Sequence, residues 1–428
     1  MKIHVVQKGE TLFSIAQQYG VSARLLQKLN EAPADGTLVP GQTLVVLLPE
    51  KTHVVRRGDT VWSIAREHGI STRELYQNNI FLQGQGALIP GEELILSLQD
   101  VHREGSLGVN GYAYPFINGD LLRQVLPYMT YATPFTYGIG AEGSLVALRD
   151  EGILAAAGQY SVLPWMHLST MTEEGRFSSA RAEALLKNNA RQETLLGQIK
   201  EILKEKGYGG LDVDFEYIRP ELGAAYAAFV DRLRRELNPL GCSVLVALAP
   251  KTSAGQRGLL YEAHDYAALG RAANGVLLMT YEWGYTAGPP MAVAPLDKVR
   301  QVVDYALTEI PAEKLFLGVP VYGYDWPLPF REGVTRGESV SPQDALALAR
   351  RHGAEIRYDE TAQAPWFRYT AAEGREHEVW FEDARSSYAK FRLAAEKGLQ
   401  GVGLWNLMRP APQTYLALHG GFEIEVMR

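Results

Sequence analysis

Three acidic residues occupy alternate positions of a short apolar segment near the middle of the 428-residue chain. Asp212, Asp214 and Glu216 are separated by single apolar residues, and this period of two predicts a β-strand. Successive side chains of a strand point to opposite faces, so the three carboxyl groups share one face, each roughly 7 Å from the next. The surrounding segment does not supply three matching Arg or Lys side chains. Because such a row of like charges is costly to bury, it indicates a functional site.

Three interpretations of this row are open. It could be the solvated face of an edge strand, but the surrounding sequence alternates strand-like and helix-like segments, a pattern in which strands are covered on both faces. It could bind Mg²⁺ or Ca²⁺, although a strand-borne row does not wrap an ion as a loop does. It could also hydrolyse glycosidic bonds, a reaction in which burial and acidic neighbours keep one carboxyl group protonated near neutral pH.

The spacing Asp212-x-Asp214-x-Glu216 resembles the end of the D-x-x-D-x-D-x-E motif of glycoside hydrolase family 18, the chitinase and N-acetylglucosaminidase family. The first Asp of that motif is replaced by Gly209. The resemblance implies that Glu216 is the general acid and then the base. It implies that Asp214 holds the substrate's acetamido N–H and that Asp212 shares a proton behind it. In this family the acetamido oxygen attacks the anomeric carbon, so we expect an oxazolinium intermediate and retention of configuration.

Further residues match the same family at the ends of expected strands. The segment Met279-Thr-Tyr281-Glu282 resembles its Met-x-Tyr-Asp pattern, with Glu in place of the usual Asp. The resemblance implies that Tyr281 holds the N-acetyl oxygen, that Trp405 forms the floor under the bound sugar, and that Tyr322 lines the cleft. Tyr281 and Trp405 could instead be core residues at strand ends.

Eight apolar segments separated by helical patterns predict an α/β fold, a (β/α)₈ TIM barrel, in which catalytic groups lie at the C-terminal ends of the strands. The expected strands are residues 107–114, 129–136, 163–169, 210–216, 243–249, 276–281, 315–321 and 401–405. The third of these lacks the Ser-x-Gly-Gly sequence often found there in chitinases, which suggests another branch of the family.

The interval 324–383, between the seventh and eighth strands, is too long for an ordinary loop. A helical pattern at residues 342–351 and alternating segments at 355–358, 366–369 and 378–381 predict a small α+β insertion that forms one wall of a cleft.

The first 98 residues contain an internal repeat, because residues 4–16 recur as residues 53–65 with few changes. We expect two modules, residues 1–48 and 51–98, ahead of a catalytic barrel in residues 105–428. In each module a Gly-acid-Thr turn precedes one helix and a Ser N-cap begins a second, which predicts a βααβ unit.

This repeat resembles the LysM module, which binds glycans that contain N-acetylglucosamine. The resemblance implies a shallow groove between the loop after the first strand and the loop before the second. The alternative is that the Gly and Thr residues only shape the turns. Two weak sites on one chain would raise the affinity for a polymer. The candidate glycan-binding residues are Gly9, Thr11, Pro40, Gly58, Thr60 and Pro90.

Composition excludes several kinds of partner. Residues 1–98 contain nine basic and nine acidic side chains, so all of the net charge of -7 lies in the rest of the chain, which argues against nucleic acid and anionic lipid as ligands. The single Cys242 excludes an intramolecular disulfide and a Cys-rich zinc site. The histidines lack metal-ligand spacing and there is no Gly-rich phosphate loop, so we expect neither a metal nor a cofactor.

No apolar run approaches the length of about 18 residues that a membrane span needs, and the start of the chain lacks the pattern of a secretory signal. Two LysM-like modules before a family 18 barrel resemble the spore cortex-lytic N-acetylglucosaminidases of endospore-forming bacteria. This resemblance implies synthesis in the mother-cell cytoplasm, association with the spore coat or cortex, and peptidoglycan as substrate. The alternatives are a chitinase or another endo-N-acetylglucosaminidase, and a non-catalytic glycan-binding coat protein, which the intact Glu216 disfavours.

Overall fold

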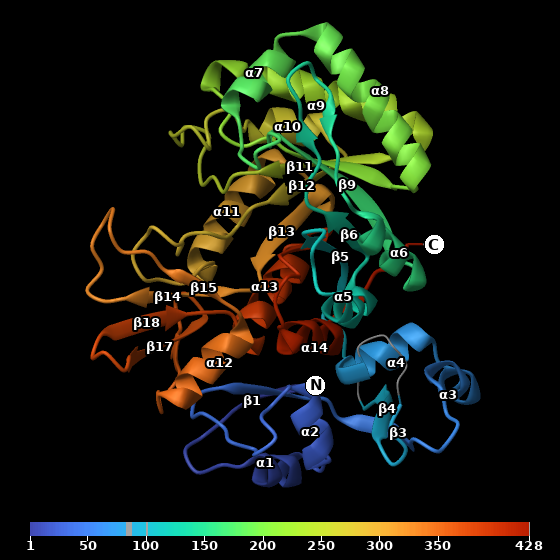
Figure 1. Cartoon of the computed structure of the whole chain (residues 1–428), viewed down its shortest axis with the longest axis vertical. Helices are drawn as coiled ribbons and strands as arrows, with labels where there is room; N and C mark the ends of the chain where they lie inside the picture. The colour runs from blue at the N-terminus through green and yellow to red at the C-terminus, as the bar shows by residue number, and fades with distance from the viewer. Residues whose placement is uncertain (83–87, 100–101, 428) are drawn as a thin grey trace.

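The computed structural model describes residues 1–82, 88–99 and 102–427. The chain folds into a barrel, a small insertion beside it and two N-terminal modules beneath it (Figure 1). Within this described part, no helix is both long enough and apolar enough to cross a membrane.

Eight parallel strands form a closed barrel, because the last of them pairs with the first. This confirms the predicted fold. In barrel order the strands are β5 (Ser106–Ala113), β6 (Tyr131–Pro134), β9 (Leu163–Ser169), β10 (Gly210–Asp214), β11 (Ser243–Leu248), β12 (Gly275–Leu278), β13 (Leu315–Pro320) and β19 (Gly401–Trp405). A short strand, β20 (Glu423–Ile424), pairs in parallel with the start of β5. The two-stranded ribbon of β7 (Gly138–Ile139) and β8 (Leu145–Val146) lies between β6 and β9 in the chain.

Helices cover the outside of the barrel (Figure 1), and several bury an apolar face. In α9 (Gly223–Leu237), for example, Tyr226, Phe229, Val230, Leu233 and Leu237 are buried, at the spacing of one helix face. The other barrel helices are α5 (Gly119–Val125), α6 (Glu151–Gln159), α7 (Ser179–Leu186), α8 (Asn189–Lys206), α10 (Tyr266–Ala272), α11 (Leu296–Glu309), α13 (Ala384–Glu396) and α14 (Pro412–Gly421). Short 3₁₀ turns occur at η2 (Leu126–Tyr128), η3 (Pro220–Leu222), η4 (Asn238–Leu240) and η5 (Ala312–Lys314).

The insertion between β13 and β19 is an α+β subdomain, as predicted, and lies at the left of Figure 1. Its antiparallel sheet consists of β15 (Glu338–Val340), β14 (Gly323–Pro327), β18 (Glu376–Trp380), β17 (Ala364–Thr370) and β16 (Arg357–Asp359), in that order. Its helix, α12 (Pro342–Arg351), spans the predicted residues and begins at a Ser341 capping box with Pro342 at its first position. The sequence did not indicate β14 and β15, because such short strands are stabilised by pairing and not by their own composition.

Both N-terminal modules have the predicted βααβ order. The first contains β1 (Lys2–Val5), α1 (Leu12–Tyr19), α2 (Ala23–Leu29) and β2 (Thr43–Val46). The second contains β3 (Pro49–Val54), α3 (Val61–His68), α4 (Thr72–Asn78) and β4 (Glu93–Leu98), with the turn η1 (Ile80–Leu82) after α4. The predicted N-caps Ser22 and Ser71 are observed, since each hydroxyl group accepts a hydrogen bond from a backbone N–H of the following helix. Thr11 and Thr60, at the end of the Gly-acid-Thr turn, cap the first helix of each module in the same way.

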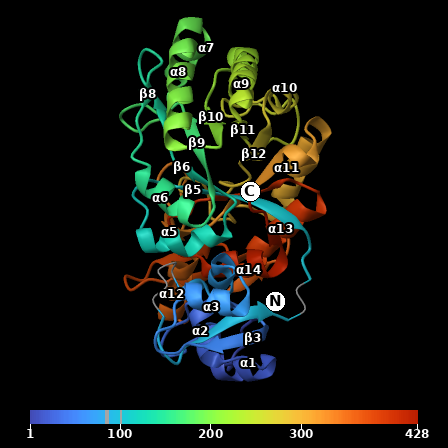
Figure 2. The ribbon, with the colours of Figure 1, turned by 90° about the vertical axis from the view of Figure 1, so that its right-hand side faces the viewer.

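The modules pack against the barrel and are not separate from it. Leu25 and Val45 of the first module, with Ile80 and Ile95 of the second, belong to the same apolar cluster as the barrel core. The view in Figure 2 shows both modules directly beneath α14 and α5. Their position relative to the barrel is therefore fixed by shared burial of apolar side chains.

Candidate active site

The carboxylate row lies at one end of the barrel, on and just after β10. Asp212 and Asp214 are buried inside the barrel, and Glu216 is half-buried two residues beyond the end of the strand. The prediction that the strand reaches residue 216 was therefore wrong by two residues. Pairing with β9 ends at Asp214 and Ser169, so the chain leaves the sheet where the barrel opens.

Asp212 is the deepest carboxyl group of the row. Burial raises its pKa to about 7, and the hydroxyl group of Tyr112, on β5, opposes this shift by donating a hydrogen bond of 2.7 Å to its Oδ2. Its Oδ1 atom is buried without a hydrogen-bond partner among the described residues. A carboxyl group with one unpaired oxygen in an apolar site is stabilised by a proton.

Asp214 is surrounded by groups that favour its neutral form. Burial raises its pKa well above the usual value, and the charges of Glu216 and Asp212 raise it further. His167 lies with Nε2 at 3.8 Å from Oδ2 of Asp214, and its Nδ1 is 2.6 Å from the hydroxyl oxygen of Thr136. Burial lowers the pKa of His167 to about 3, so the imidazole is neutral and does not offset the carboxylate charge.

Glu216 lines a cavity of about 440 Å³ at the mouth of the barrel. Burial raises its pKa to about 7, which is the range that a general acid needs near neutral pH. Asp214, Tyr281 and Trp405 line the same cavity, so the barrel wall does not separate Glu216 from the aromatic residues. Eight further Tyr, Phe and Trp side chains contribute to its surface: Tyr112, Tyr114, Phe135, Phe177, Tyr217, Tyr261, Trp283 and Tyr285.

Trp405 is the last residue of β19 and stands among other rings. Its ring lies 6.4 Å from that of Tyr281, with 16° between the planes, and 4.9 Å from that of Phe135. Burial raises the pKa of Tyr281, so its hydroxyl group keeps its proton and can donate a hydrogen bond to a ligand. Met279 also lines the cavity. An indole face beside a hydroxyl donor suits the apolar face of a sugar ring and its polar substituents.

Glu282 and Tyr322 lie at the side of the cavity that faces the insertion. The hydroxyl group of Tyr322 donates a hydrogen bond to Oε1 of Glu282, and that of Tyr324 donates to the same oxygen at 3.1 Å. Glu282 lines both the main cavity and an adjoining pocket that contains Tyr322, Tyr324 and Trp405. Because Tyr324 belongs to β14, the insertion forms part of the wall of this adjoining pocket.

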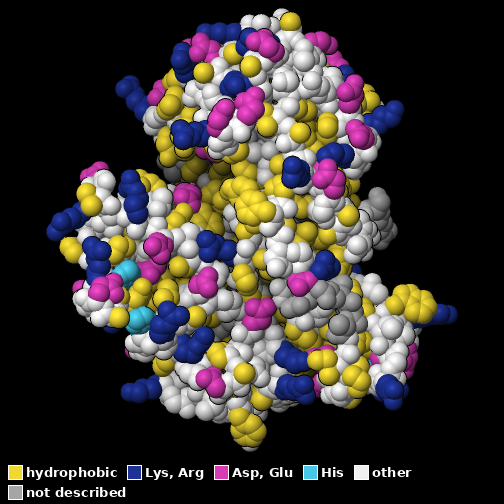
Figure 3. Space-filling view, viewed as in Figure 1, with side chains coloured by type: hydrophobic (Ala, Val, Ile, Leu, Met, Phe, Trp, Pro, Cys, Tyr) yellow, Lys and Arg dark blue, Asp and Glu magenta, His cyan; other side chains and the backbone are white. Residues whose placement is uncertain are grey.

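In Figure 3 hydrophobic side chains gather in a hollow between the helices at the top of the view and the insertion at the left. The described residues include no group of three or more His, Cys, Asp or Glu side chains that could hold a metal ion.

Tyr112 and His167 are site residues that no motif of the sequence indicated. Tyr112 lies near the end of the predicted strand 107–114, so the rule that functional groups lie at strand ends points to its neighbourhood. His167 is at the position where the analysis noted only the missing Ser-x-Gly-Gly sequence. Its contact with Asp214 depends on the register between β9 and β10, which the sequence does not reveal.

The candidate glycan-binding residues lie in two equivalent loop pairs. In each module the Gly-acid-Thr turn is exposed, and its acid holds the His of the first strand, since Glu10 accepts from His4 at 2.9 Å and Asp59 from His53 at 2.8 Å. Gly9 has a φ of +89°, which favours glycine, so this residue also has a role in the turn. Pro40 and Pro90 precede Gly41 and Gly91, whose N–H groups donate hydrogen bonds of 2.8 Å to the carbonyl oxygens of Val6 and Val55, respectively.

Comparison with known proteins identifies both parts of the chain. The family model described as "Glycosyl hydrolases family 18" matches residues 171–409, and that of the LysM domain matches residues 4–47 and 53–97. The chain is 41% identical over 426 residues to the cortical fragment-lytic enzyme of Bacillus subtilis (strain 168), and the match covers 99% of both chains.

Two solved structures are similar over almost the whole length. The crystal structure of the spore cortex-lytic enzyme SleL from Bacillus megaterium QM B1551 superposes with a TM-score of 0.84 at 37% identity, over 100% of this chain and 99% of that one. The crystal structure of SleL from Bacillus cereus also has a TM-score of 0.84, at 33% identity, over 99% of this chain and 98% of that one.

Proposed function

The chain belongs to the glycosyl hydrolases of family 18 and contains two LysM domains, and from this premise we propose that it hydrolyses β-1,4 bonds after N-acetylglucosamine in peptidoglycan. It is a glycoside hydrolase. Peptidoglycan of the spore cortex is the proposed substrate because the cortical fragment-lytic enzyme of Bacillus subtilis is similar along the entire chain. The observation that carries the proposal is the cavity in which Asp214 and Glu216 meet Tyr281 and Trp405.

In the proposed reaction Glu216 acts first as an acid. Burial raises the pKa of its carboxyl group to about 7, so the group is largely protonated below that pH. It donates this proton to the glycosidic oxygen as the bond from that oxygen to the anomeric carbon breaks. The acetamido oxygen of the same sugar forms the new bond to this carbon and gives an oxazolinium ion. The Glu216 carboxylate then accepts a proton from water as the water oxygen attacks the anomeric carbon and the bond from the acetamido oxygen to that carbon breaks, which restores the acetamido group. Two inversions at that carbon amount to retention.

Asp214 and Asp212 would stabilise the positive intermediate. Asp214 has a buried Oδ1 atom without a partner among the described residues, and this oxygen can accept the acetamido N–H. The row does not carry three full charges, because burial also keeps Asp212 partly protonated near neutral pH. The positive charge that develops on the substrate favours the ionised form of Asp214, and a pair of opposite charges in a desolvated cavity is an effective form of electrostatic stabilisation.

Tyr281, Trp405, Met279, Glu282 and Tyr322 would bind the sugar. Tyr281 would donate its hydroxyl hydrogen to the acetyl oxygen, and Trp405 would support the pyranose face and the acetyl methyl group. The LysM modules would hold the glycan near the cleft, and the proposed location of the protein is the coat or cortex region of the spore.

Digestion of two substrates tests this function. We expect the native protein to release fragments from spore cortex peptidoglycan, and the Glu216→Gln variant to release none, when the products are analysed by mass. Cleavage of colloidal chitin alone would favour a chitinase, and cleavage that survives the substitution would remove Glu216 as the acid.

The role of the acetamido group has its own test. A thiazoline analogue of N-acetylglucosamine mimics the oxazolinium ion and should inhibit the enzyme competitively. An absence of inhibition, together with a trapped glycosyl ester on Asp214, would contradict the substrate-assisted route.

A further inference from the structure

The two LysM modules have the same local backbone but different surroundings. Gly41 and Gly91 occupy the same position of the repeat and have φ angles of +84° and +86°. A Cβ atom added at Gly91 would meet no described atom within 4 Å, whereas one at Gly41 would lie 1.8 Å from the backbone oxygen of Ile356 in the insertion. The loop before the closing strand is therefore open in the second module and covered in the first.

The side chain two residues earlier shows the same difference. Val39 of the first module is 3% exposed, while Ile89, its counterpart in the second, is 58% exposed. Val39 belongs to the apolar core of the insertion, with residues such as Phe367. The N–H of Ile356 also donates a hydrogen bond of 3.0 Å to the carbonyl oxygen of Pro40. Pro40, a candidate glycan-binding residue, is thus part of an internal interface.

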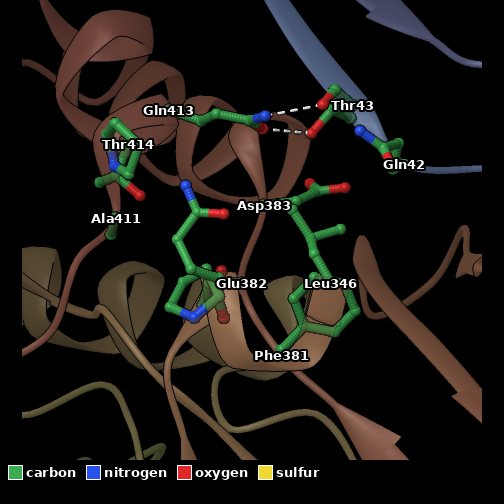
Figure 4. A pocket seen from close by; sticks show the side chains of 12 residues that line it. Gln42, Thr43, Leu346, Phe381, Glu382, Asp383, Ala411, Gln413 and Thr414 are labelled. Atoms are coloured by element: carbon green, nitrogen blue, oxygen red, sulfur yellow. Dashed lines mark hydrogen bonds between the residues drawn. The ribbon is translucent and has the colours of Figure 1, made fainter. Parts of the chain in front are cut away.

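Polar contacts extend this interface from the insertion to the barrel. The guanidinium of Arg385, on α13, donates a hydrogen bond of 3.1 Å to the carbonyl oxygen of Gly41. Figure 4 shows the Thr43 hydroxyl group and backbone carbonyl paired with the amide of Gln413, at 2.5 Å and 2.7 Å. Side chains from all three parts of the chain line the small cavity there: Gln42, Leu346, Phe381 and Thr414. These hydrogen bonds keep the loop before β2 covered by the insertion and the barrel.

The second module contacts the barrel through α4. The guanidinium of Arg73, on α4, donates hydrogen bonds to the carbonyl oxygens of Pro127 at 2.9 Å and Met129 at 2.6 Å. The Oδ1 atom of Asn78, also on α4, lies 2.8 Å from Nε2 of His419 on α14. Because these contacts come from the helix, residues 56–58 and 89–91 in the two groove loops are left exposed.

We propose that only the second module binds the glycan, and that the first module uses the equivalent loop to hold the insertion subdomain, one wall of the catalytic cleft. The occupant of the open groove is a single strand containing N-acetylglucosamine, so this inference rests on the glycan-binding part of the proposed function. The protein then binds the polymer at one site outside the cleft. The higher affinity that two linked LysM sites would give is absent.

Steric blocking of each groove tests the inference in the full chain. Lys8 and Arg57 are exposed, equivalent residues that each precede the Gly of the turn. Each is changed to Cys in the Glu216→Gln protein and coupled to a bulky polyethylene glycol maleimide, while the native Cys242 is buried. Binding to insoluble peptidoglycan is measured by sedimentation, with the uncoupled variants as controls. In a parallel variant, Ile89→Asp places a charge in the open groove.

We expect the adduct at residue 57 and the Ile89→Asp change each to raise the apparent Kd about tenfold or more, and the adduct at residue 8 to change it less than about twofold. An equal loss from the adduct at residue 8 would overturn the inference but leave glycan binding by the LysM modules in place. Unchanged binding with every variant would overturn both, because the barrel alone would then hold the glycan. Cleavage by the native protein, measured separately, reports on the proposed reaction.

Discussion

Replacement of Glu216 by Gln should stabilise the folded protein while it removes the activity. The glutamine has nearly the same shape but cannot ionise, so it relieves the cost of a charged carboxylate in the cavity. It cannot donate the proton that the leaving sugar needs, and loss of a general acid typically lowers the rate by about 10²- to 10⁴-fold. The two effects have opposite signs and one physical origin, which is the burial of Glu216.

The size of the stability gain follows from the pKa. Burial raises the pKa of Glu216 from 4.5 to about 7, so the folded state holds the proton more tightly than the unfolded state. The ionisation of Glu216 therefore costs no free energy of unfolding below about pH 4.5, and it lowers this free energy as the pH rises towards 7. This rise of the pKa to about 7 corresponds to a loss of about 3 kcal/mol of stability at about pH 8, and of less than about 1 kcal/mol at about pH 5. The variant also removes a charge that raises the pKa of Asp214, which acts in the same direction.

The assay is urea unfolding of native protein and variant at about pH 5 and about pH 8, followed by Trp fluorescence. Glu221→Gln is the matched control, because Glu221 is exposed a few residues further along the same loop and should give no gain at either pH. If Glu216→Gln is no more stable than the native protein at about pH 8, the carboxyl group is not strained, and the reasoning from burial to acid catalysis fails.

Three further outcomes follow from the structure. Because Glu216 must be protonated, kcat/KM should fall as the pH rises through about 7, and a pH-rate profile that stays flat there would contradict this. Tyr112→Phe removes the hydrogen bond that lowers the pKa of Asp212, so we expect kcat to fall about tenfold with little change in KM, and an unchanged kcat in steady-state assays would show that this bond is not used. Thr60→Ala removes an N-cap and should lower the free energy of unfolding by about 1 kcal/mol in urea titrations, whereas Thr60→Ser should restore it.

Much of the fold could be predicted because its signals are local. The period of two around Asp214, the apolar runs of the barrel strands, the Ser N-caps, and the duplicated Gly-acid-Thr turn all depend on neighbours in the chain. The errors lie where local signals end: β10 stops at Asp214 although the alternation continues to Glu216. Pairing with β9 and β11 decides where a strand ends, and those partners are distant in the sequence.

The proposed site was only partly visible in the sequence. Glu216, Tyr281 and Trp405 were selected by motif, and the structure brings them to one cavity, while their roles stay predictions. Tyr112 and His167 were missed, because Tyr112 reaches Asp212 only across the closed barrel and His167 reaches Asp214 only through the register of β9 and β10.

The sequence by itself determined which face of the strand carries the carboxyl groups and that the chain begins with two copies of one module. Both follow from covalent order and the geometry of a single strand or turn. Only the tertiary structure decided that burial raises the pKa of Glu216, and that Val39 is covered while Ile89 is open. Burial is a property of the surroundings, so two nearly identical loops differ once the insertion packs against one of them.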